Sequence, residues 1–162
     1  MNTIPASTGR CTCGAVRYRL ETAPMLVHCC HCRWCQRETG SAFVLNALVE
    51  RDALTVLQGS PEEVPVPSES GRGQRIVRCP GCKVALWSHY PGGGDAIAFV
   101  RVGTLDDPAR HPPDVHIHTA SKQPWVVLPD DAVAFDAFYD PADVWPQGAR
   151  ERYRAAKARM TD

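Results

Sequence analysis

Short segments of strand length, either apolar throughout or alternating with polar residues, recur along the chain and are separated by turn-forming residues. Residues 16–20 alternate with the period of a half-buried strand, and the runs 43–49 and 96–102 are apolar enough for buried strands. Further runs of strand length follow at 54–57, 64–66, 75–78, 85–87 and 116–118. Because glycine and proline bound most of these runs, the pattern predicts an all-β assembly of sheets.

The end of the chain has a helical pattern instead. Its apolar residues recur at helical spacing, at Ala149, Tyr153, Ala156 and Met160. This spacing predicts one C-terminal helix. The surrounding basic residues are Arg150, Arg152, Arg154, Lys157 and Arg159. We interpret the segment as a solvated helix docked through one stripe, since five basic residues on one helix are weak support for nucleic-acid binding. A short helical turn is also expected over 35–39, ending at Gly40.

The composition fits one globular domain. The 162 residues are 44% apolar and 22% charged, and the formal net charge is zero. A neutral chain gives no electrostatic reason to expect nucleic acid or an anionic membrane as a partner. No apolar run reaches the roughly 18 residues of a membrane span, and the first residues lack the basic and apolar regions of a signal peptide. We therefore expect a cytoplasmic protein.

All eight cysteines lie in three clusters, and their spacing is that of metal ligands. One pair is Cys11 and Cys13, another is Cys79 and Cys82, and a dense central cluster occupies residues 29–35. The central cysteines are Cys29, Cys30, Cys32 and Cys35. In a reducing compartment, closely spaced cysteines are more often metal ligands than disulfides. The clusters therefore predict zinc sites.

The two outer pairs predict a structural zinc site at Cys11, Cys13, Cys79 and Cys82. A structural zinc takes four ligands in a tetrahedron, most often thiolates. Two short-spaced pairs from distant parts of the chain are the common arrangement, and turn residues at 80–81 suit the second pair. Such a site staples two distant hairpins together, so its metal should contribute strongly to folding.

The central cluster predicts a second zinc with one free coordination position. Cys30, Cys32 and Cys35 form a Cys-x-Cys-x-x-Cys segment that can wrap one ion. Cys29 is adjacent to Cys30, and neighbouring residues of an extended backbone face opposite ways. Three thiolates leave a fourth position for water or substrate, as in catalytic zinc sites. This site suits an exogenous thiol, because zinc lowers the pKa of a coordinated thiol and binds soft sulfur.

Alternatives stay open for this cluster. His28 or His31 would make the second site structural by completing its ligands, and Cys29 is the residue type of a small buried side chain. A redox role for the pair Cys32 and Cys35 is a further alternative, although no thioredoxin-like βαβ pattern surrounds it.

A general acid or base would most naturally be a histidine, because histidine titrates near neutrality. The candidates are His31, His89, His116 and His118. For each of them the alternative is an ordinary structural or surface histidine, so the sequence singles out none.

The cysteine motifs carry characteristic flanking residues. They are Cys11-x-Cys13-Gly14-Ala15-Val16-Arg17-Tyr18, Cys30-His31-Cys32-x-x-Cys35-Gln36-Arg37-x-Thr39-Gly40-Ser41-Ala42-Phe43, Cys79-x-x-Cys82 and His116-Ile117-x-x-x-Ser121-Lys122-x-Pro124-Trp125. Over residues 10–138 this pattern resembles the glutathione-dependent formaldehyde-activating (GFA) family, or CENP-V/GFA domain. One departure is Lys83, where members of the family usually carry glycine.

The resemblance implies a β-tent fold of antiparallel sheets, like the Mss4-type zinc domains, followed here by a C-terminal helix. It implies two zinc ions per chain. The structural ion would bind Cys11, Cys13, Cys79 and Cys82, and the second ion would bind Cys30, Cys32 and Cys35. We divide the chain into a flexible N-terminus at 1–9, a GFA-like zinc domain at 10–140 and a helical tail at 141–162.

The activity implied by the resemblance is that of a zinc-dependent carbon–sulfur lyase, which forms or cleaves S-(hydroxymethyl)glutathione from formaldehyde and glutathione. A small thiol such as glutathione is then the expected partner. Candidates to bind its carboxylates are Arg33, Arg37, Arg101 and Lys122, each of which is otherwise an ordinary surface charge. Because the family includes centromere-associated relatives, the alternative is a non-catalytic, zinc-stabilised binding or scaffold domain.

Overall fold

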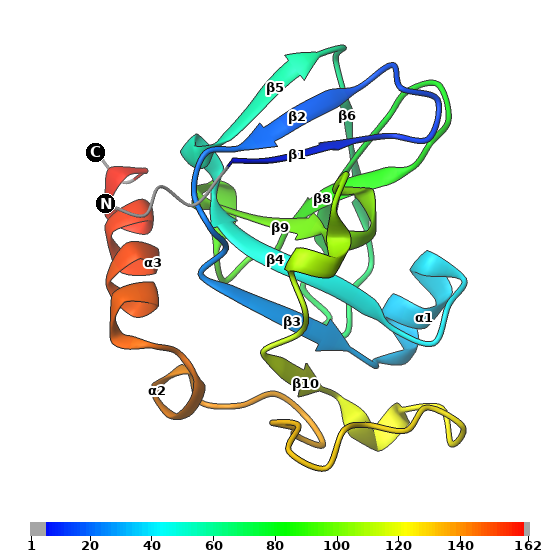
Figure 1. Ribbon diagram of the computed structural model, residues 1–162, viewed down its shortest axis with the longest axis vertical. Helices are drawn as coiled ribbons and strands as arrows, with labels where there is room; N and C mark the ends of the chain where they lie inside the picture. Colours follow the sequence, from blue (N-terminus) through cyan, green and yellow to red (C-terminus); the bar gives the residue numbers. More distant parts are fainter. Residues whose placement is uncertain (1–5, 161–162) are drawn as a thin grey trace.

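Two β-sheets and a C-terminal helix make up the computed structural model, which describes residues 6–160 (Figure 1). The three-stranded sheet has the order β1-β2-β5, with β1 at Ser7–Arg10, β2 at Arg17–Leu20 and β5 at Leu54–Gln58. The seven-stranded sheet has the order β10-β3-β4-β9-β8-β7-β6. Its strands are β3 Leu26–Cys30, β4 Val44–Glu50, β6 Glu62–Val66, β7 Gln74–Arg78, β8 Ala85–His89, β9 Ile97–Arg101 and β10 Val115–Ile117. The predicted all-β class is confirmed.

Helices are few and short except at the end of the chain. They are α1 Arg33–Thr39, α2 Pro141–Val144 and α3 Gln147–Arg159, and the 3-10 turns are η1 Arg51–Ala53, η2 Gly94–Ala96, η3 Val102–Thr104, η4 Pro108–Arg110 and η5 Thr119–Ser121. As predicted, α1 ends at Gly40, which has the left-handed φ of 64° that glycine adopts without strain. The predicted C-terminal helix is α3.

One strand pairing departs from the antiparallel sheets that the resemblance implied. Strand β10 pairs with β3 in parallel, with Val115 opposite His28, His116 opposite Cys29 and Ile117 opposite Cys30. The other pairings between named strands of the described chain are antiparallel. In Figure 1, β10 lies at the lower edge of the sheet beside β3, where the chain returns after β9.

Strand β1 begins within the N-terminal segment 1–9. Strand β1 already includes Ser7, which pairs with Leu20, and Gly9, which pairs with Tyr18. A Cβ atom at Gly9 would lie 2.4 Å from the Tyr18 ring, so the absence of a side chain permits this close pairing. The part of the expectation that concerns residues 1–5 lies outside the described chain.

The seven-stranded sheet separates two hydrophobic clusters because its side chains alternate between its faces. On one face, Val27 and Ala47 join a cluster that also contains Tyr18 and Trp87. On the other face, Leu26 and Leu48 join a cluster that receives the C-terminal helix. Cys30, at the end of β3, belongs to the second cluster, and so do Cys32 and Cys35, which follow that strand. Cys11 and Cys79 belong to the first. The fold thus places the two expected zinc sites on opposite sides of the sheet.

Helix α3 docks against the sheet through small residues and paired charges. Ala149 and Ala156 are buried in the second cluster. The Arg152 guanidinium donates to both carboxylate oxygens of Glu50, at 2.7 and 2.6 Å. Part of the basic character of this helix is therefore used in contacts within the chain. None of the helices in the described chain has both the length and the apolar character that spanning a membrane requires.

Candidate metal centres

The four cysteines of the predicted structural site converge in the structure. Their sulfur atoms all lie within 4.8 Å of one another. Cys11 Sγ and Cys13 Sγ are 3.5 Å apart, and Cys13 Sγ and Cys79 Sγ are 3.7 Å apart. A tetrahedral zinc with bonds of about 2.3 Å to sulfur separates its thiolates by about 3.8 Å. The donor set Cys11, Cys13, Cys79 and Cys82 therefore fits a zinc ion.

Tight backbone turns aim these sulfurs at one point. The Gly14 amide donates to the Cys11 carbonyl oxygen at 3.1 Å, and Gly14 has a φ of 76° that suits glycine. In the second turn, the Lys83 amide donates to the Cys79 carbonyl oxygen at 3.0 Å. Lys83 has a φ of 61°, a left-handed conformation that costs a residue with a side chain about 1–2 kcal/mol. This geometry explains why glycine is the expected residue at that position.

Backbone amides also favour the thiolate form at this site. Hydrogen bonds from the amides of Cys13 and Val84 lower the pKa of the Cys82 thiol to about 6. The Val16 amide donates to Cys11 Sγ at 3.3 Å. Because the thiolate is the metal-binding form of cysteine, these amides prepare the site for a cation.

The three cysteines of the predicted second site also converge. We call Cys30, Cys32 and Cys35 the central triad; their sulfur atoms lie within 4.8 Å of one another. Cys30 ends β3, Cys32 caps the start of α1, and Cys35 lies in the first turn of that helix. The Cys35 amide donates to Cys32 Sγ at 3.3 Å. The group contains no fourth histidine, cysteine or carboxylate from the described residues.

Hydrogen bonding within the central triad concentrates negative charge on one sulfur. Cys30 and Cys35 donate to Cys32, and these bonds lower the pKa of the Cys32 thiol. The same interaction with Cys32 raises the pKa of the Cys30 thiol. A divalent cation would replace the shared protons and bind all three sulfurs, so the donor set fits a zinc ion with three protein ligands.

Gln36 and Ser121 hold the loop that carries the central triad. The Gln36 amide nitrogen donates to the His31 carbonyl oxygen at 2.7 Å and to the Ser121 carbonyl oxygen at 2.9 Å. The Ser121 hydroxyl also donates to the His31 carbonyl oxygen, at 3.0 Å. A segment 85 residues away in sequence therefore fixes the backbone between Cys30 and Cys32.

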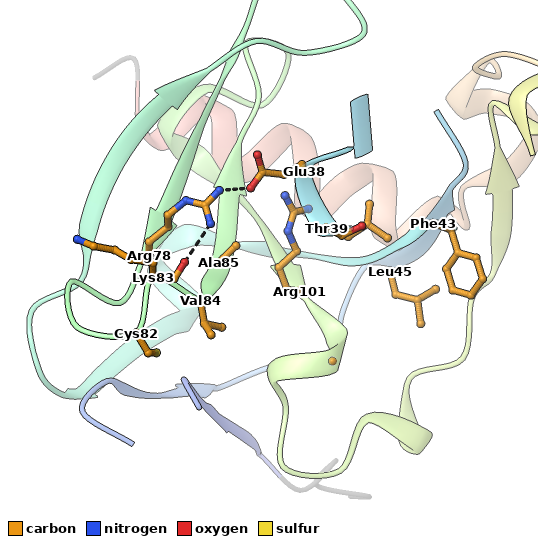
Figure 2. A pocket seen from close by; sticks show the side chains of 12 residues that line it. Glu38, Thr39, Phe43, Leu45, Arg78, Cys82, Lys83, Val84, Ala85 and Arg101 are labelled. Atoms are coloured by element: carbon orange, nitrogen blue, oxygen red, sulfur yellow. Dashed lines mark hydrogen bonds and ion pairs between the residues drawn. The ribbon is translucent and has the colours of Figure 1, made fainter. Parts of the chain in front are cut away.

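Two pockets flank helix α1, and their linings contain none of the central triad. The first, with a volume of about 500 Å³, is lined by Glu38, Thr39, Phe43, Val44, Leu45, Arg78, Cys82, Lys83, Val84, Ala85, Arg101 and Gly103. In Figure 2, the Arg101 side chain extends between Thr39 and the Arg78–Glu38 ion pair. The second is lined by Arg33, Gln36, Arg37, Gly40, Ser41, Ala42, Gln123 and Trp125. Both pockets therefore present guanidinium groups beside the helix that carries Cys35.

Arg101 is the most buried of the four cations that the sequence proposed as carboxylate ligands. It is 6% exposed, donates to Asn46 Oδ1, and has a buried Nε without a hydrogen-bond partner among residues 6–160. The hydrogen bond with Cys30 lowers the pKa of the Cys35 thiol, but the hydrogen bond and charge of Cys32, together with burial, raise that pKa overall, and the charge of Arg101 makes only a small opposing contribution. Lys122 instead donates to the Val126 carbonyl oxygen at 2.6 Å, and Arg33 pairs with Gln36.

The histidines do not join the central triad. His28 Nε2 lies 2.5 Å from the Tyr139 hydroxyl, and burial together with His118 lowers the pKa of His28 to about 4. His89 Nδ1 lies 2.9 Å from the Ile97 carbonyl oxygen, away from the cysteine groups. Neither His28 nor His31 therefore lies close enough to the three sulfurs of the central triad to complete the second site.

The sequence reasoning missed a third convergent group. Cys29, His31 and His116 place one sulfur and two imidazole nitrogens within 4.8 Å of one another. Burial raises the pKa of the Cys29 thiol to about 12, and burial, with smaller effects of His116 and Lys122, lowers the pKa of His31 to about 4. The only signal in the sequence is the alternation of Cys29 and His31, because the strand that carries His116 lies far away in the chain.

Comparisons with known proteins agree with the cysteine pattern. A model of the glutathione-dependent formaldehyde-activating enzyme family matches residues 6–121. A protein of Halomonas elongata, provisionally named as a glutathione-dependent formaldehyde-activating enzyme, is 27% identical over 126 residues, which cover 74% of this chain and 79% of that protein. A crystal structure of a Rhodobacter sphaeroides protein has a TM-score of 0.45 at 19% identity and covers 61% of this chain and 87% of that one.

Proposed function

The chain belongs to the glutathione-dependent formaldehyde-activating enzyme family, and on that premise we propose that it is a zinc-dependent carbon–sulfur lyase acting on a thiol or on its adduct with an aldehyde. With glutathione and formaldehyde, the carbon–sulfur bond of S-(hydroxymethyl)glutathione forms as the carbonyl π bond breaks, and the thiol proton ends on the new hydroxyl oxygen. Cleavage is the reverse. The observation that carries the proposal is the central triad, with three converging sulfurs and no fourth protein donor among the described residues.

Two zinc ions per chain belong to this proposal. Cys11, Cys13, Cys79 and Cys82 would hold the structural ion, and the central triad would hold the second one. A zinc ion at the triad supplies a Lewis acid that lowers the pKa of an incoming thiol. The chain's own part is to fix the three sulfurs, which it does through the Gln36 and Ser121 hydrogen bonds to the His31 carbonyl oxygen.

We propose that Arg101 binds a carboxylate of the thiol substrate. Its side chain lines the pocket of Figure 2 beside α1, and its Nε has no hydrogen-bond partner in the described part of the chain. A guanidinium fork matches a carboxylate with two parallel hydrogen bonds. Arg101 lines the pocket together with Glu38 and Thr39 of α1, so a carboxylate held there would lie beside the helix that carries Cys35. A reduced thiol pool is a property of the cytoplasm, which is the location that we propose for the protein.

The test compares two cysteine variants of the zinc-loaded chain. The measurement is the rate at which glutathione and formaldehyde interconvert with S-(hydroxymethyl)glutathione, followed by exchange NMR. Cys32→Ser should lose catalysis at least 100-fold and keep its circular dichroism, because serine still caps the start of α1. Cys79→Ser should unfold, because it breaks the structural site. Full activity in Cys32→Ser without its second zinc, or unfolding equal to that of Cys79→Ser, contradicts the proposal.

A second candidate function is a non-catalytic, zinc-stabilised binding domain, favoured by the burial of the triad. Cys30, Cys32 and Cys35 are 6%, 3% and 6% exposed. Cobalt substitution distinguishes the two functions, since the absorption of cobalt reports its ligands. Glutathione should change the spectrum of the triad ion in an enzyme that binds a thiol there. An unchanged spectrum at saturating glutathione favours the binding domain.

A further inference from the structure

The group of Cys29, His31 and His116 occupies one face of the sheet because of strand register. Cys29 and His31 are two residues apart, and such residues in an extended segment share a face. Strands β3 and β10 are parallel, and His116 is directly opposite Cys29, so its side chain points to the same face. Cys30 and Ile117 point to the opposite face. This group and the central triad therefore lie on different sides of β3.

Interatomic distances in this group are close to those of ligands that share a metal. Cys29 Sγ lies 3.5 Å from His31 Nε2, and His31 Nε2 lies 3.0 Å from His116 Nδ1. A tetrahedral zinc with bonds of about 2.0 Å to nitrogen and about 2.3 Å to sulfur separates nitrogen from sulfur by about 3.5 Å and two nitrogens by about 3.3 Å. The observed sulfur–nitrogen distance matches that geometry. The observed nitrogen–nitrogen distance is shorter than that geometry by a few tenths of an ångström.

The surroundings shield this group from solvent. All three residues are buried, and His31 is 0% exposed. The polar contacts of the His31 ring both fall on Nε2, the atom that faces Cys29 and His116, whereas Nδ1 has no partner in the described chain. The ring therefore presents its ligand atom to the centre of the group. Two imidazoles and a thiolate suit zinc better than the hard cations magnesium or calcium.

We propose that Cys29, His31 and His116 form a third zinc site, separate from the two cysteine sites. Its structural role is to staple β10 to β3. Strand β10 has only three residues, and its neighbour on the side away from β3 is a single bridge between His116 and Ala134, so few hydrogen bonds hold it. Zinc bonds between His31 and His116, which are 85 residues apart, would close a long loop and fix the segment that carries Ser121. The Cys29 thiol proton is released to solvent when the ion binds.

The test is the zinc content of the full chain after reloading and dialysis against buffer, with X-ray absorption at the zinc edge as an independent readout. The wild type should hold three zinc ions, with imidazole scattering in the spectrum. Cys29→Ala and His116→Gln should each hold two, and His116→Gln should lose imidazole scattering. His118→Gln, close to the end of β10 but outside the group, is the matched control and should hold three.

Three outcomes overturn the proposal. One is a wild-type content of two ions whose zinc edge shows sulfur scattering only, and another is a content of three ions without imidazole scattering. The third is a zinc content that stays at three in both Cys29→Ala and His116→Gln. If circular dichroism shows that a variant does not fold, the wild-type content and its imidazole scattering decide alone. Lyase activity is not part of this test, so a failure of the proposed reaction leaves its result intact.

Discussion

The side-chain amide of Gln36 donates to the His31 carbonyl oxygen at 2.7 Å, and this bond ties helix α1 to the loop between two ligands of the central triad. The same amide donates to the Ser121 carbonyl oxygen. Gln36 is buried, so no water replaces these bonds freely. Its position makes it the residue that fixes the backbone between Cys30 and Cys32.

Replacing Gln36 with leucine should weaken the triad's hold on zinc by about 10–100-fold, because residues that orient metal ligands typically contribute that much. The structural site lies on the other side of the sheet and should keep its ion. Competition with a coloured zinc chelator measures both affinities. Gln147→Leu, at an exposed position of α3, is the control and should change neither. Equal weakening of both sites in Gln36→Leu would point to general unfolding and contradict the orienting role.

Lys83→Gly should stabilise the zinc-loaded protein by about 1 kcal/mol, because it relieves the left-handed backbone of the second zinc turn. The substitution also removes the exposed ion pair of Lys83 with Glu62, which is worth little. Lys83→Ala is the matched control: it loses the same ion pair and keeps the strained φ, so it should give no gain. Urea unfolding of the three proteins measures the difference. Equal stability of the glycine and alanine variants would show that the backbone carries no strain here.

Arg152→Gln should destabilise the protein by about 1–2 kcal/mol, because it leaves the Glu50 carboxylate buried without its charged donor. The Glu50 side chain is 10% exposed and Arg152 is 34% exposed, which limits the loss. Arg154→Gln, on the exposed side of the same helix, is the control and should change the free energy of unfolding by less than about 0.5 kcal/mol. Similar losses in both variants would mean that the helix is held by its charge in general and not by this pair.

The stability that His89 contributes should fall as the pH falls below neutrality. Burial lowers the pKa of His89 below its usual value of 6.5 in the folded protein. The folded state thus favours neutral imidazole, and the contribution is complete above pH 6.5. It is lost as the pH falls from 6.5 through the folded pKa, since the unfolded chain takes up the proton first.

The measurement is the difference in unfolding free energy between the wild type and His89→Gln from pH 7.5 to 5. Acid also releases metal, but this effect is common to both proteins and cancels in the difference. The wild type should lose stability relative to the variant over this range. A constant difference would contradict a lowered pKa of His89, and so would a ring signal in NMR that titrates at 6.5.

Local patterns in the sequence predicted most of the elements and two of the cysteine groups. The alternation at 16–20 and the apolar run at 43–49 became β2 and β4, because each pattern matches the period or burial of a strand. The helical turn expected over 35–39 became the end of α1, because Gly40 supplies the signal that ends the helix. The pairs Cys11/Cys13 and Cys79/Cys82 each lie in a local turn, so a few neighbouring residues determine the geometry of each pair.

Contacts between distant segments could not be predicted from local patterns. Ser7 to Gly9 looked like a loose end, and only the pairing of Gly9 with Tyr18 makes them a strand. Likewise, the sequence did not distinguish Arg101 from three other candidate cations, whereas the structure buries it beside the pocket next to α1. Neither result has a local signal, because both depend on which strand lies alongside.

The sequence by itself determined that the cysteine pairs have the spacing of metal ligands, since ligand spacing within a turn is set by neighbouring residues alone. Only the tertiary structure decided that His116 meets Cys29 and His31, because a parallel register between β3 and β10 brings together residues that 85 positions of chain keep apart. Strand register is chosen by the packing of the whole sheet, and no short stretch of sequence contains it.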